Sequence, residues 1–219
     1  MLPRTLIDSA TIPGGGEIRL IRRGSEFSIM LGGTELMNSR VKGSEEALAR
    51  FGCAGVPARA RVLIGGLGMG FTLRAALEAL GPEARVTVAE LVPAVVRWAR
   101  GPMAELLGGA LDDRRVEIFD EDVADSIARG GWDSILLDVD NGPGGLTRPE
   151  NDRLYGRAGL AAARDALTRG GMLAIWSSHP DPAFASRLKR AGFSFEEQVV
   201  RSGPSGKGPR HVIWLARRR

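Results

Sequence analysis

The chain has 219 residues, of which 43% are hydrophobic and 26% charged, and this composition is typical of a globular protein. The length suffices for one α/β domain with a small appendage and one active centre. No apolar run approaches the roughly 18 residues that a membrane span requires, and the N-terminus lacks the apolar core of a secretory signal. We therefore expect a cytoplasmic protein that does not contact the membrane.

Charge and cysteine content narrow the classes of partner. The net charge is +4, but the basic residues are mostly arginines scattered among carboxylates. They are not interleaved with the aromatic side chains of a base-stacking surface, so a nucleic-acid partner is not expected. Cys53 is the single cysteine, and His179 and His211 are the two histidines of the chain. These residues do not form a zinc-binding pattern, and no metal is expected.

The first part of the chain is predicted to be rich in β-strands. Residues 17–23 and 26–31 alternate or run apolar and are separated by Gly24 and Ser25, which favours a hairpin. A helix is predicted over 44–51, with Ser44 as its N-cap. We divide the chain into an N-terminal β-rich segment, residues 1–42, and a larger second domain, residues 43–219.

From Arg61 onward, strand and helix patterns alternate, which indicates an α/β fold with a parallel sheet. Strands are predicted at 61–64, 85–89, 115–119, 133–137 and 172–176, and helices at 70–80, 93–100, 123–129, 155–168 and 182–190. Two further strands, 193–200 and 211–216, are joined by a segment rich in glycine and proline. Five parallel strands followed by a terminal antiparallel pair resemble the Rossmann-like sheet of class I methyltransferases.

The strongest local motif is a glycine turn between an apolar strand and an Ala-rich helix, with the sequence IGGLGMG at residues 64–70. Gly66, Gly68 and Gly70 let the backbone approach a ligand closely, and the following helix offers free N–H groups. The same glycines could instead serve only to pack the helix on the strand. No Lys followed by Ser or Thr comes after the turn, which excludes a phosphate-binding loop.

Acidic residues follow the next two strands. Glu90 ends the second strand, 20 residues beyond Gly70, where a carboxylate accepts hydrogen bonds from ribose hydroxyls. Asp122 follows the third strand and could bind an adenine amino group. An ordinary solvated carboxylate is the alternative for Glu90, and a helix N-cap is the alternative for Asp122. Glycines and two acids at three successive strand ends predict a nucleoside site; the glycine spacing is not the usual one for NAD.

The fourth strand is followed by Asp138 and Asp140, with Asn141 beside them. Paired acids at this edge of the sheet can hold a cationic amine or remove its proton, and a neutral amine is the nucleophile that group transfer requires. We therefore predict that Asp138 and Asp140 are catalytic. The alternative is an Asx-turn that ends a buried strand.

Over nearly its whole length the chain resembles the spermidine synthases, the polyamine aminopropyltransferases. The features that carry this resemblance are the β-rich N-terminus, the glycine turn, Glu90, Asp122, Asp138 and Leu154-Tyr155. Members of that family transfer the aminopropyl group of decarboxylated S-adenosylmethionine to putrescine. The resemblance implies that Glu90 holds the ribose, Asp122 the adenine, and that Asp138 faces the reacting amine. It also implies a homodimer.

The chain departs from the family pattern at three places. Gly68 replaces an acid of the glycine turn, Ser44-Glu45-Glu46 replaces Tyr-Gln-Glu, and Asn141 replaces a second acid. The missing turn acid would no longer repel the α-carboxylate of S-adenosylmethionine. Our main hypothesis is therefore methyl transfer from S-adenosylmethionine to a small amine-bearing acceptor.

Two alternatives stay open at this point. One is aminopropyl transfer from decarboxylated S-adenosylmethionine, with Asp140, Glu45 or Glu46 in place of the lost anchors. The other is a nucleoside-binding protein without catalysis. His179 could act as a base, although a polar histidine in a surface loop is the better interpretation. Four tryptophans are interpreted as packing residues: Trp98, Trp132, Trp176 and Trp214.

Overall fold

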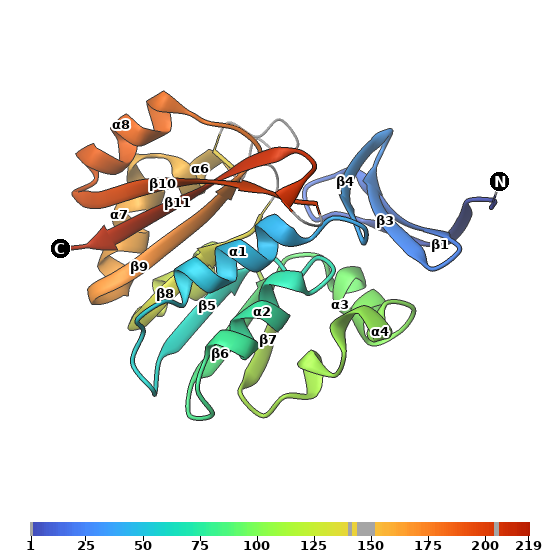
Figure 1. Cartoon of the computed structure of the whole chain (residues 1–219), viewed down its shortest axis with the longest axis horizontal. Coiled ribbons are helices and arrows are strands. Elements are labelled where there is room, and N and C mark those ends of the chain that lie inside the picture. The colour runs from blue at the N-terminus through green and yellow to red at the C-terminus, as the bar shows by residue number, and fades with distance from the viewer. Residues whose placement is uncertain (1, 140–141, 144–151, 204–205) are drawn as a thin grey trace.

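The computed structural model describes residues 2–139, 142–143, 152–203 and 206–219. Its N-terminal part is a four-stranded antiparallel sheet in the order β1-β2-β3-β4 (Figure 1). The strands are β1 (Thr5–Thr11), β2 (Glu17–Arg23), β3 (Glu26–Leu31) and β4 (Thr34–Asn38). The predicted β2–β3 hairpin is thus present, and the structure adds β1 and β4 on either side of it. Strand β1 gives no alternating signal because nearly all of its side chains are exposed.

The second sheet has seven strands in the order β10-β11-β9-β8-β5-β6-β7. Its strands are β5 (Arg61–Gly65), β6 (Arg85–Glu90), β7 (Val116–Asp120), β8 (Trp132–Leu137), β9 (Leu167–Ser177), β10 (Phe193–Arg201) and β11 (Arg210–Arg218). Strands β5 to β9 are parallel, and β11 pairs antiparallel with both β9 and β10. The predicted α/β class, with five parallel strands and a terminal antiparallel pair, is therefore confirmed.

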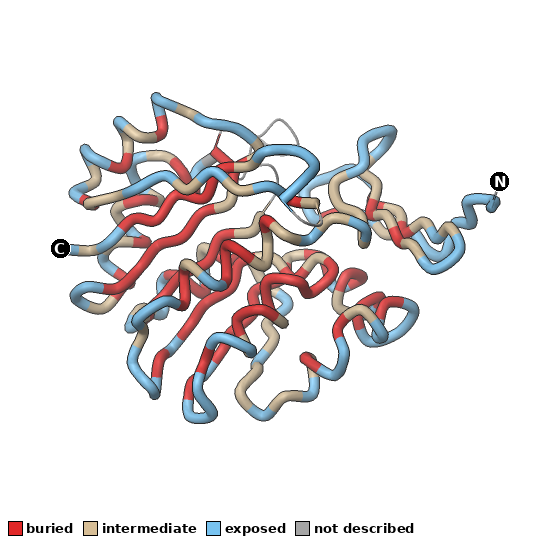
Figure 2. The backbone as a smooth tube through the Cα atoms, viewed as in Figure 1, coloured by how far each residue is buried: buried red, intermediate tan, exposed pale blue. Residues whose placement is uncertain are grey.

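Helices cover both faces of this sheet. They are α1 (Gly43–Gly52), α2 (Phe71–Ala79), α3 (Pro93–Arg100), α4 (Ala104–Leu107), α5 (Val123–Ala128), α6 (Asp152–Tyr155), α7 (Arg157–Ala166) and α8 (Pro182–Arg190), with a 3₁₀ turn η1 at Ala110–Asp112. Along β5, Val62 and Ile64 pack in the cluster that contains α1, α2 and α3, whereas Leu63 packs in the cluster of α5, α7 and α8. The central strands are accordingly buried along most of their length (Figure 2).

Two local predictions were wrong. Helix α1 begins at Gly43 with Lys42 as its N-cap residue, because the Ser44 side chain bonds to Glu45 and His211 instead of capping the helix. The helix predicted over 155–168 is divided into α6 and α7. It also ends earlier than predicted, because Leu167 already pairs with Trp132 as the first residue of β9.

The N-terminal sheet is attached to the larger domain through α3. Trp98 on this helix donates a hydrogen bond from Nε1 to Oδ2 of Asp8 on β1, at 2.7 Å. Apolar side chains of β2, β3 and β4 also pack in the same cluster as α1, α2 and α3. No helix in the described part of the chain has the length and apolar character of a membrane span.

Candidate active site

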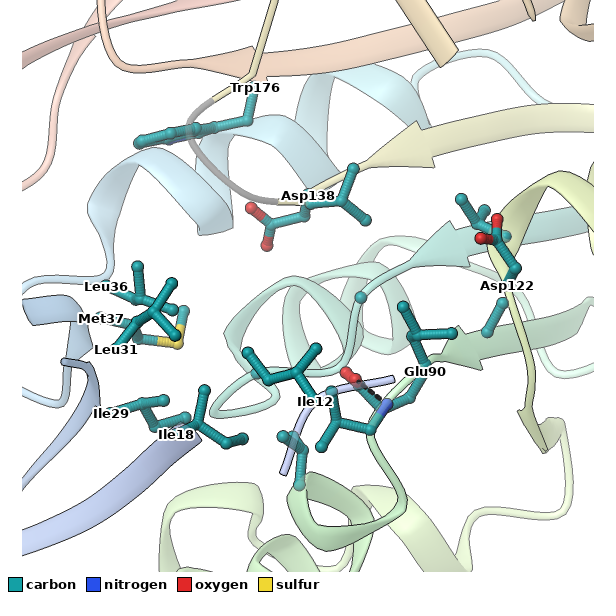
Figure 3. A pocket seen from close by; sticks show the side chains of 18 of the residues that line it. Ile12, Ile18, Ile29, Leu31, Leu36, Met37, Glu90, Asp122, Asp138 and Trp176 are labelled. Atoms are coloured by element: carbon teal, nitrogen blue, oxygen red, sulfur yellow. Dashed lines mark hydrogen bonds between the residues drawn. The ribbon is translucent and has the colours of Figure 1, made fainter. Parts of the chain in front are cut away.

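A pocket of about 220 Å³ lies between the carboxyl ends of the parallel strands and the N-terminal sheet (Figure 3). Its lining includes Gly66, Gly68, Glu90, Asp122 and Asp138, so the structure brings five of the predicted site residues to one cavity. Their roles toward a ligand stay predictions. Asp140, which was also predicted to be catalytic, and the neighbouring Asn141 lie outside the described residues.

The glycine turn forms the floor between β5, β6 and β8. The Gly66 N–H donates to the carbonyl of Ala89, and the Asp138 N–H donates to the carbonyl of Gly65. Gly66 has φ +88°, and a Cβ there would come within 2.5 Å of the Asp138 carbonyl oxygen. Only glycine fits this position without strain. Gly70 lies behind the turn as the N-cap residue of α2, facing Leu107, and does not line the pocket.

Glu90 is nearly buried, with 7% of its surface exposed. Its Oε2 accepts a hydrogen bond from the Leu67 N–H and its Oε1 accepts one from the Val92 N–H, both at 2.9 Å. Burial raises the pKa of this carboxyl, and the backbone N–H groups partly offset that effect. Each carboxylate oxygen has a further lone pair, so Glu90 can hold the turn in place and still accept hydrogen bonds from a ligand.

Asp122 is the N-cap residue of α5, which was the alternative to adenine binding in the sequence analysis. Its Oδ1 accepts a hydrogen bond from the Ala124 N–H at 2.9 Å, and its Oδ2 pairs with the guanidinium of Arg153. The same side chain lines the pocket next to Val123. Capping and ligand binding are therefore compatible at this position, because a carboxylate has about four acceptor sites.

Asp138 belongs to a pair of interacting acids. Its Oδ2 accepts a hydrogen bond from Thr72 Oγ1 at 2.6 Å, and this hydroxyl oxygen is 3.5 Å from the backbone carbonyl oxygen of Glu45. Burial and the charge of Glu45 raise the pKa of Asp138 to about 7. Burial, followed by the charge of Glu46, also raises the pKa of Glu45. Both Glu45 and Asp138, the acid pair, line the pocket.

A polar chain leads from the acid pair to the terminal strand. Ser44 Oγ donates to Glu45 Oε2 at 2.7 Å and lies 2.9 Å from His211 Nδ1. Because the hydroxyl has one proton, which it gives to Glu45, His211 must donate from Nδ1. The His211 ring makes an edge contact with Trp176, with ring centroids 4.7 Å apart, and Trp176 lines the pocket. Burial lowers the pKa of His211, which favours the neutral imidazole, and the tautomer with its proton on Nδ1 then supplies this donor.

The sequence did not indicate that Ser44 and His211 take part in this series of hydrogen bonds. The replacement of Tyr-Gln-Glu by Ser44-Glu45-Glu46 pointed to the right segment, whereas no local motif surrounds His211. His211 reaches the site because β11 pairs with β9 next to Trp176. His179, by contrast, is exposed and contacts Ser178 outside the pocket lining.

Met37 occupies the space in front of Gly68. Its sulfur accepts a hydrogen bond from the Met69 N–H at 3.2 Å, and a Cβ on Gly68 would come within 2.9 Å of that sulfur. Gly68 has φ +51°, which also disfavours a side chain. A thioether therefore lies at the place where the spermidine synthase pattern has a turn acid.

Curated proteins similar in sequence are polyamine aminopropyltransferases. The one from Mycobacterium tuberculosis is 29% identical over 170 residues, covering 75% of this chain and 31% of that protein. The one from Corynebacterium efficiens is 33% identical over 129 residues, covering 55% of this chain and 23% of that protein. This chain thus spans less than a third of the length of these relatives. No family model matches it.

Solved structures show the same fold. Spermidine synthase from Thermotoga maritima superposes with a TM-score of 0.78 at 22% identity, covering 98% of this chain and 73% of that one. A spermidine synthase in complex with the transition-state analogue AdoDATO superposes with a TM-score of 0.76 at 21% identity, covering 98% and 72%. The chain therefore has the α/β fold of the spermidine synthases and is similar in sequence to the polyamine aminopropyltransferases.

Proposed function

We propose that this chain transfers an aminopropyl group from decarboxylated S-adenosylmethionine to an amine. The observation that carries the proposal is the acid pair, Glu45 and Asp138, in a pocket that also presents Glu90 and Asp122. The similarity to polyamine aminopropyltransferases and the shared fold support the same activity. The proposal replaces methyl transfer, which the sequence alone had favoured.

The nucleoside fits the end of the pocket that holds Glu90 and Asp122. We assign the ribose hydroxyls to Glu90, the adenine amino group to Asp122, and close contact with the nucleoside to the bare backbone of Gly66. Gly68 is also placed beside the donor. This assignment needs no metal, and the donor itself supplies the reactive sulfonium.

The acid pair bears on the choice between the two donors. Methyl transfer was favoured because Gly68 removes a carboxylate that would repel the α-carboxylate of S-adenosylmethionine. Glu45, however, brings another carboxylate into the pocket beside Asp138. A donor with a carboxylate would meet like charges there, whereas the ammonium of the decarboxylated donor would meet opposite charges. Glu45 thus compensates for the acid that is missing at Gly68.

The acid pair also suits the chemistry of the acceptor. The incoming ammonium must lose a proton before its nitrogen attacks the methylene carbon bound to sulfur. A new C–N bond then forms, the C–S bond breaks, and its electron pair stays on sulfur as a neutral thioether. Asp138, with a pKa of about 7, can accept the proton near neutral pH, while Glu45 contributes negative charge that holds the cation.

The thioether nucleoside released in the reaction identifies the group that was transferred. With decarboxylated S-adenosylmethionine and a mixture of amines, we expect release of 5′-methylthioadenosine, and at least roughly hundredfold less with Asp138→Asn. Glu46→Gln is the control, because Glu46 is the acid next to Glu45 on α1 but pairs with Lys42 and does not line the pocket. Release of S-adenosylhomocysteine from S-adenosylmethionine would establish methyl transfer instead. Binding of nucleoside without turnover would favour the non-catalytic alternative.

A further inference from the structure

We propose that the acceptor is a primary amine with an apolar tail, and that this chain selects such an amine over a diamine. The inference rests on the proposed function and specifies the acceptor of the same site. It follows from an uneven distribution of charge among the described residues of the pocket, which are acidic at one end and carry hydrocarbon and thioether groups at the other.

Two of the four carboxylates that line the described pocket are each held by two partners in the chain, whereas the acid pair accepts hydroxyl hydrogen bonds from Ser44 and Thr72. Glu90 accepts from the Leu67 and Val92 N–H groups, and Asp122 caps α5 and pairs with Arg153. The acid pair is left to attract a cation. Thr72 lies within 3.5 Å of both an Asp138 carboxylate oxygen and the Glu45 backbone carbonyl, and the charge of Glu45 acts on Asp138. These acids are therefore neighbours, and their two negative charges can attract the ammonium of the acceptor as well as that of the donor.

The opposite end of the pocket is an apolar wall contributed by the N-terminal sheet. Five side chains form it: Ile18, Ile29, Leu31, Leu36 and Met37. Two cross-strand pairs make it continuous, since Ile18 is opposite Leu31 and Ile29 is opposite Met37. Figure 3 shows these residues on the far side of Asp138 from Asp122.

The wall and the acid pair favour different parts of one molecule. An ammonium held by the acid pair would direct the rest of a linear amine along the apolar wall. A second ammonium there would lose its hydration against hydrocarbon, which is strongly unfavourable for an unpaired charge. An alkyl or aryl tail would instead gain from the burial of apolar surface. The geometry therefore matches an amine with one charged end.

The matched ligands for a test are n-pentylamine and 1,4-diaminobutane, which differ in a terminal methyl group against a terminal amine. Binding of each is measured by calorimetry with 5′-methylthioadenosine present at saturation. We expect n-pentylamine to bind at least roughly tenfold more tightly. From propylamine to pentylamine, each added methylene should improve affinity by roughly threefold to fourfold. Equal binding of the two amines, tighter binding of the diamine, or no binding of either amine would overturn the proposal.

A charge placed on the apolar wall should reverse the preference. Leu36 is half-buried, so Leu36→Glu can fold while presenting a second carboxylate to the far end of the acceptor. We expect 1,4-diaminobutane to gain at least roughly tenfold relative to n-pentylamine in this variant. Leu36→Gln, which adds polarity without charge, should weaken n-pentylamine but leave the diamine no better bound. Leu31→Glu, at another half-buried position of the wall, repeats the test if Leu36→Glu does not fold.

These measurements can refute the proposed acceptor class without refuting aminopropyl transfer, and the reverse also holds. Amine affinity with the product nucleoside bound requires neither turnover nor a particular donor. A preference for n-pentylamine without release of 5′-methylthioadenosine would keep the acceptor class and refute aminopropyl transfer. Release of 5′-methylthioadenosine with the diamine as the better substrate would keep the transfer and refute the acceptor class.

Discussion

Thr72 controls the protonation of Asp138 through a single hydrogen bond. The hydroxyl donates to the carboxylate, which lowers the pKa of Asp138 against the upward effects of burial and of Glu45. If the ionised acid pair accepts the proton of the amine, kcat/KM must rise with pH through a midpoint near 7. Because the two acids interact, this midpoint belongs to the pair.

Thr72→Val should move that midpoint upward by about one pH unit, since loss of a hydrogen bond to a charged group costs about 1.5 kcal/mol. Activity should then fall by roughly tenfold well below the midpoint and change little at about pH 9. Thr72→Ser keeps the hydroxyl and should keep the wild-type profile. The measurement is the pH dependence of kcat/KM. An unshifted profile in Thr72→Val would show that Asp138 does not accept the proton of the amine.

Asp138 should also lower the stability of the folded protein at neutral and higher pH. Its folded-state pKa of about 7 lies above the ordinary value of 3.8, so the folded state is favoured at low pH and loses this contribution as the pH rises toward 7. Asp138→Asn should therefore stabilise the protein by roughly 1–2 kcal/mol at about pH 8, with little difference near pH 4. Urea unfolding at both pH values tests this, with exposed Asp125→Asn as a control that should show no such gain.

The residues at strand ends could be recognised from the sequence, because Gly66, Glu90 and Asp138 each follow an apolar run that a strand pattern identifies. The second acid of the pair could not be assigned in this way. Glu45 lies on α1 rather than at a strand end, and only the packing of α1 on α2 places it beside Thr72 and Asp138.

At the scale of elements, α1 and β11 meet at the hydrogen bond between Ser44 and His211. We expect His211 to act as a positioning residue that fixes the Ser44 hydroxyl, and through it the Glu45 carboxylate. Neither Ser44 nor His211 lines the pocket, so their effect on an acceptor must pass through Glu45 and Trp176.

His211→Ala should raise KM for the amine by roughly threefold to tenfold, the value of one hydrogen bond between neutral groups, while the affinity for nucleoside stays unchanged. His211→Asn should recover most of the loss, because the amide nitrogen can donate where Nδ1 does. If His211 had a purely structural role, both variants would be less stable, and the KM for the amine would not change separately from the affinity for nucleoside. Equal KM values in wild type and a folded His211→Ala variant would remove His211 from the site.

Element boundaries were harder to predict than element types. The alternation of strands and helices sufficed for the seven-stranded sheet, because its central strands β5, β6, β8 and β9 are largely buried apolar runs. Strand β4 was missed because its short segment Thr34–Asn38 is partly exposed and carries Glu35 and Asn38, which do not favour strands. The start of β9 was missed because Leu167 continues the apolar spacing of α7 and only pairing with Trp132 makes it extended.

At the scale of the molecule, the pocket exists because two sheets meet. The strand ends of the seven-stranded sheet supply the glycine turn and three of the acids, α1 supplies Glu45, and the N-terminal sheet supplies the apolar wall. A one-dimensional pattern shows which residues end strands but not which surface of a second sheet faces them. For this reason the pocket residues at strand ends could be predicted, whereas Glu45 and the apolar wall could not. The homodimer implied by resemblance stays a prediction.

The selection of the donor by the acid pair is tested most directly by calorimetry with S-adenosylmethionine and its decarboxylated form. Two unit charges about 4 Å apart interact by about 4 kcal/mol at an effective dielectric constant near 20, so even a much reduced effect should favour the decarboxylated donor by at least tenfold. Glu45→Gln should narrow that ratio, whereas Glu46→Gln, which removes a charge outside the pocket that raises the pKa of Glu45, should not narrow it. Equal or tighter binding of S-adenosylmethionine by the wild-type chain would contradict aminopropyl transfer.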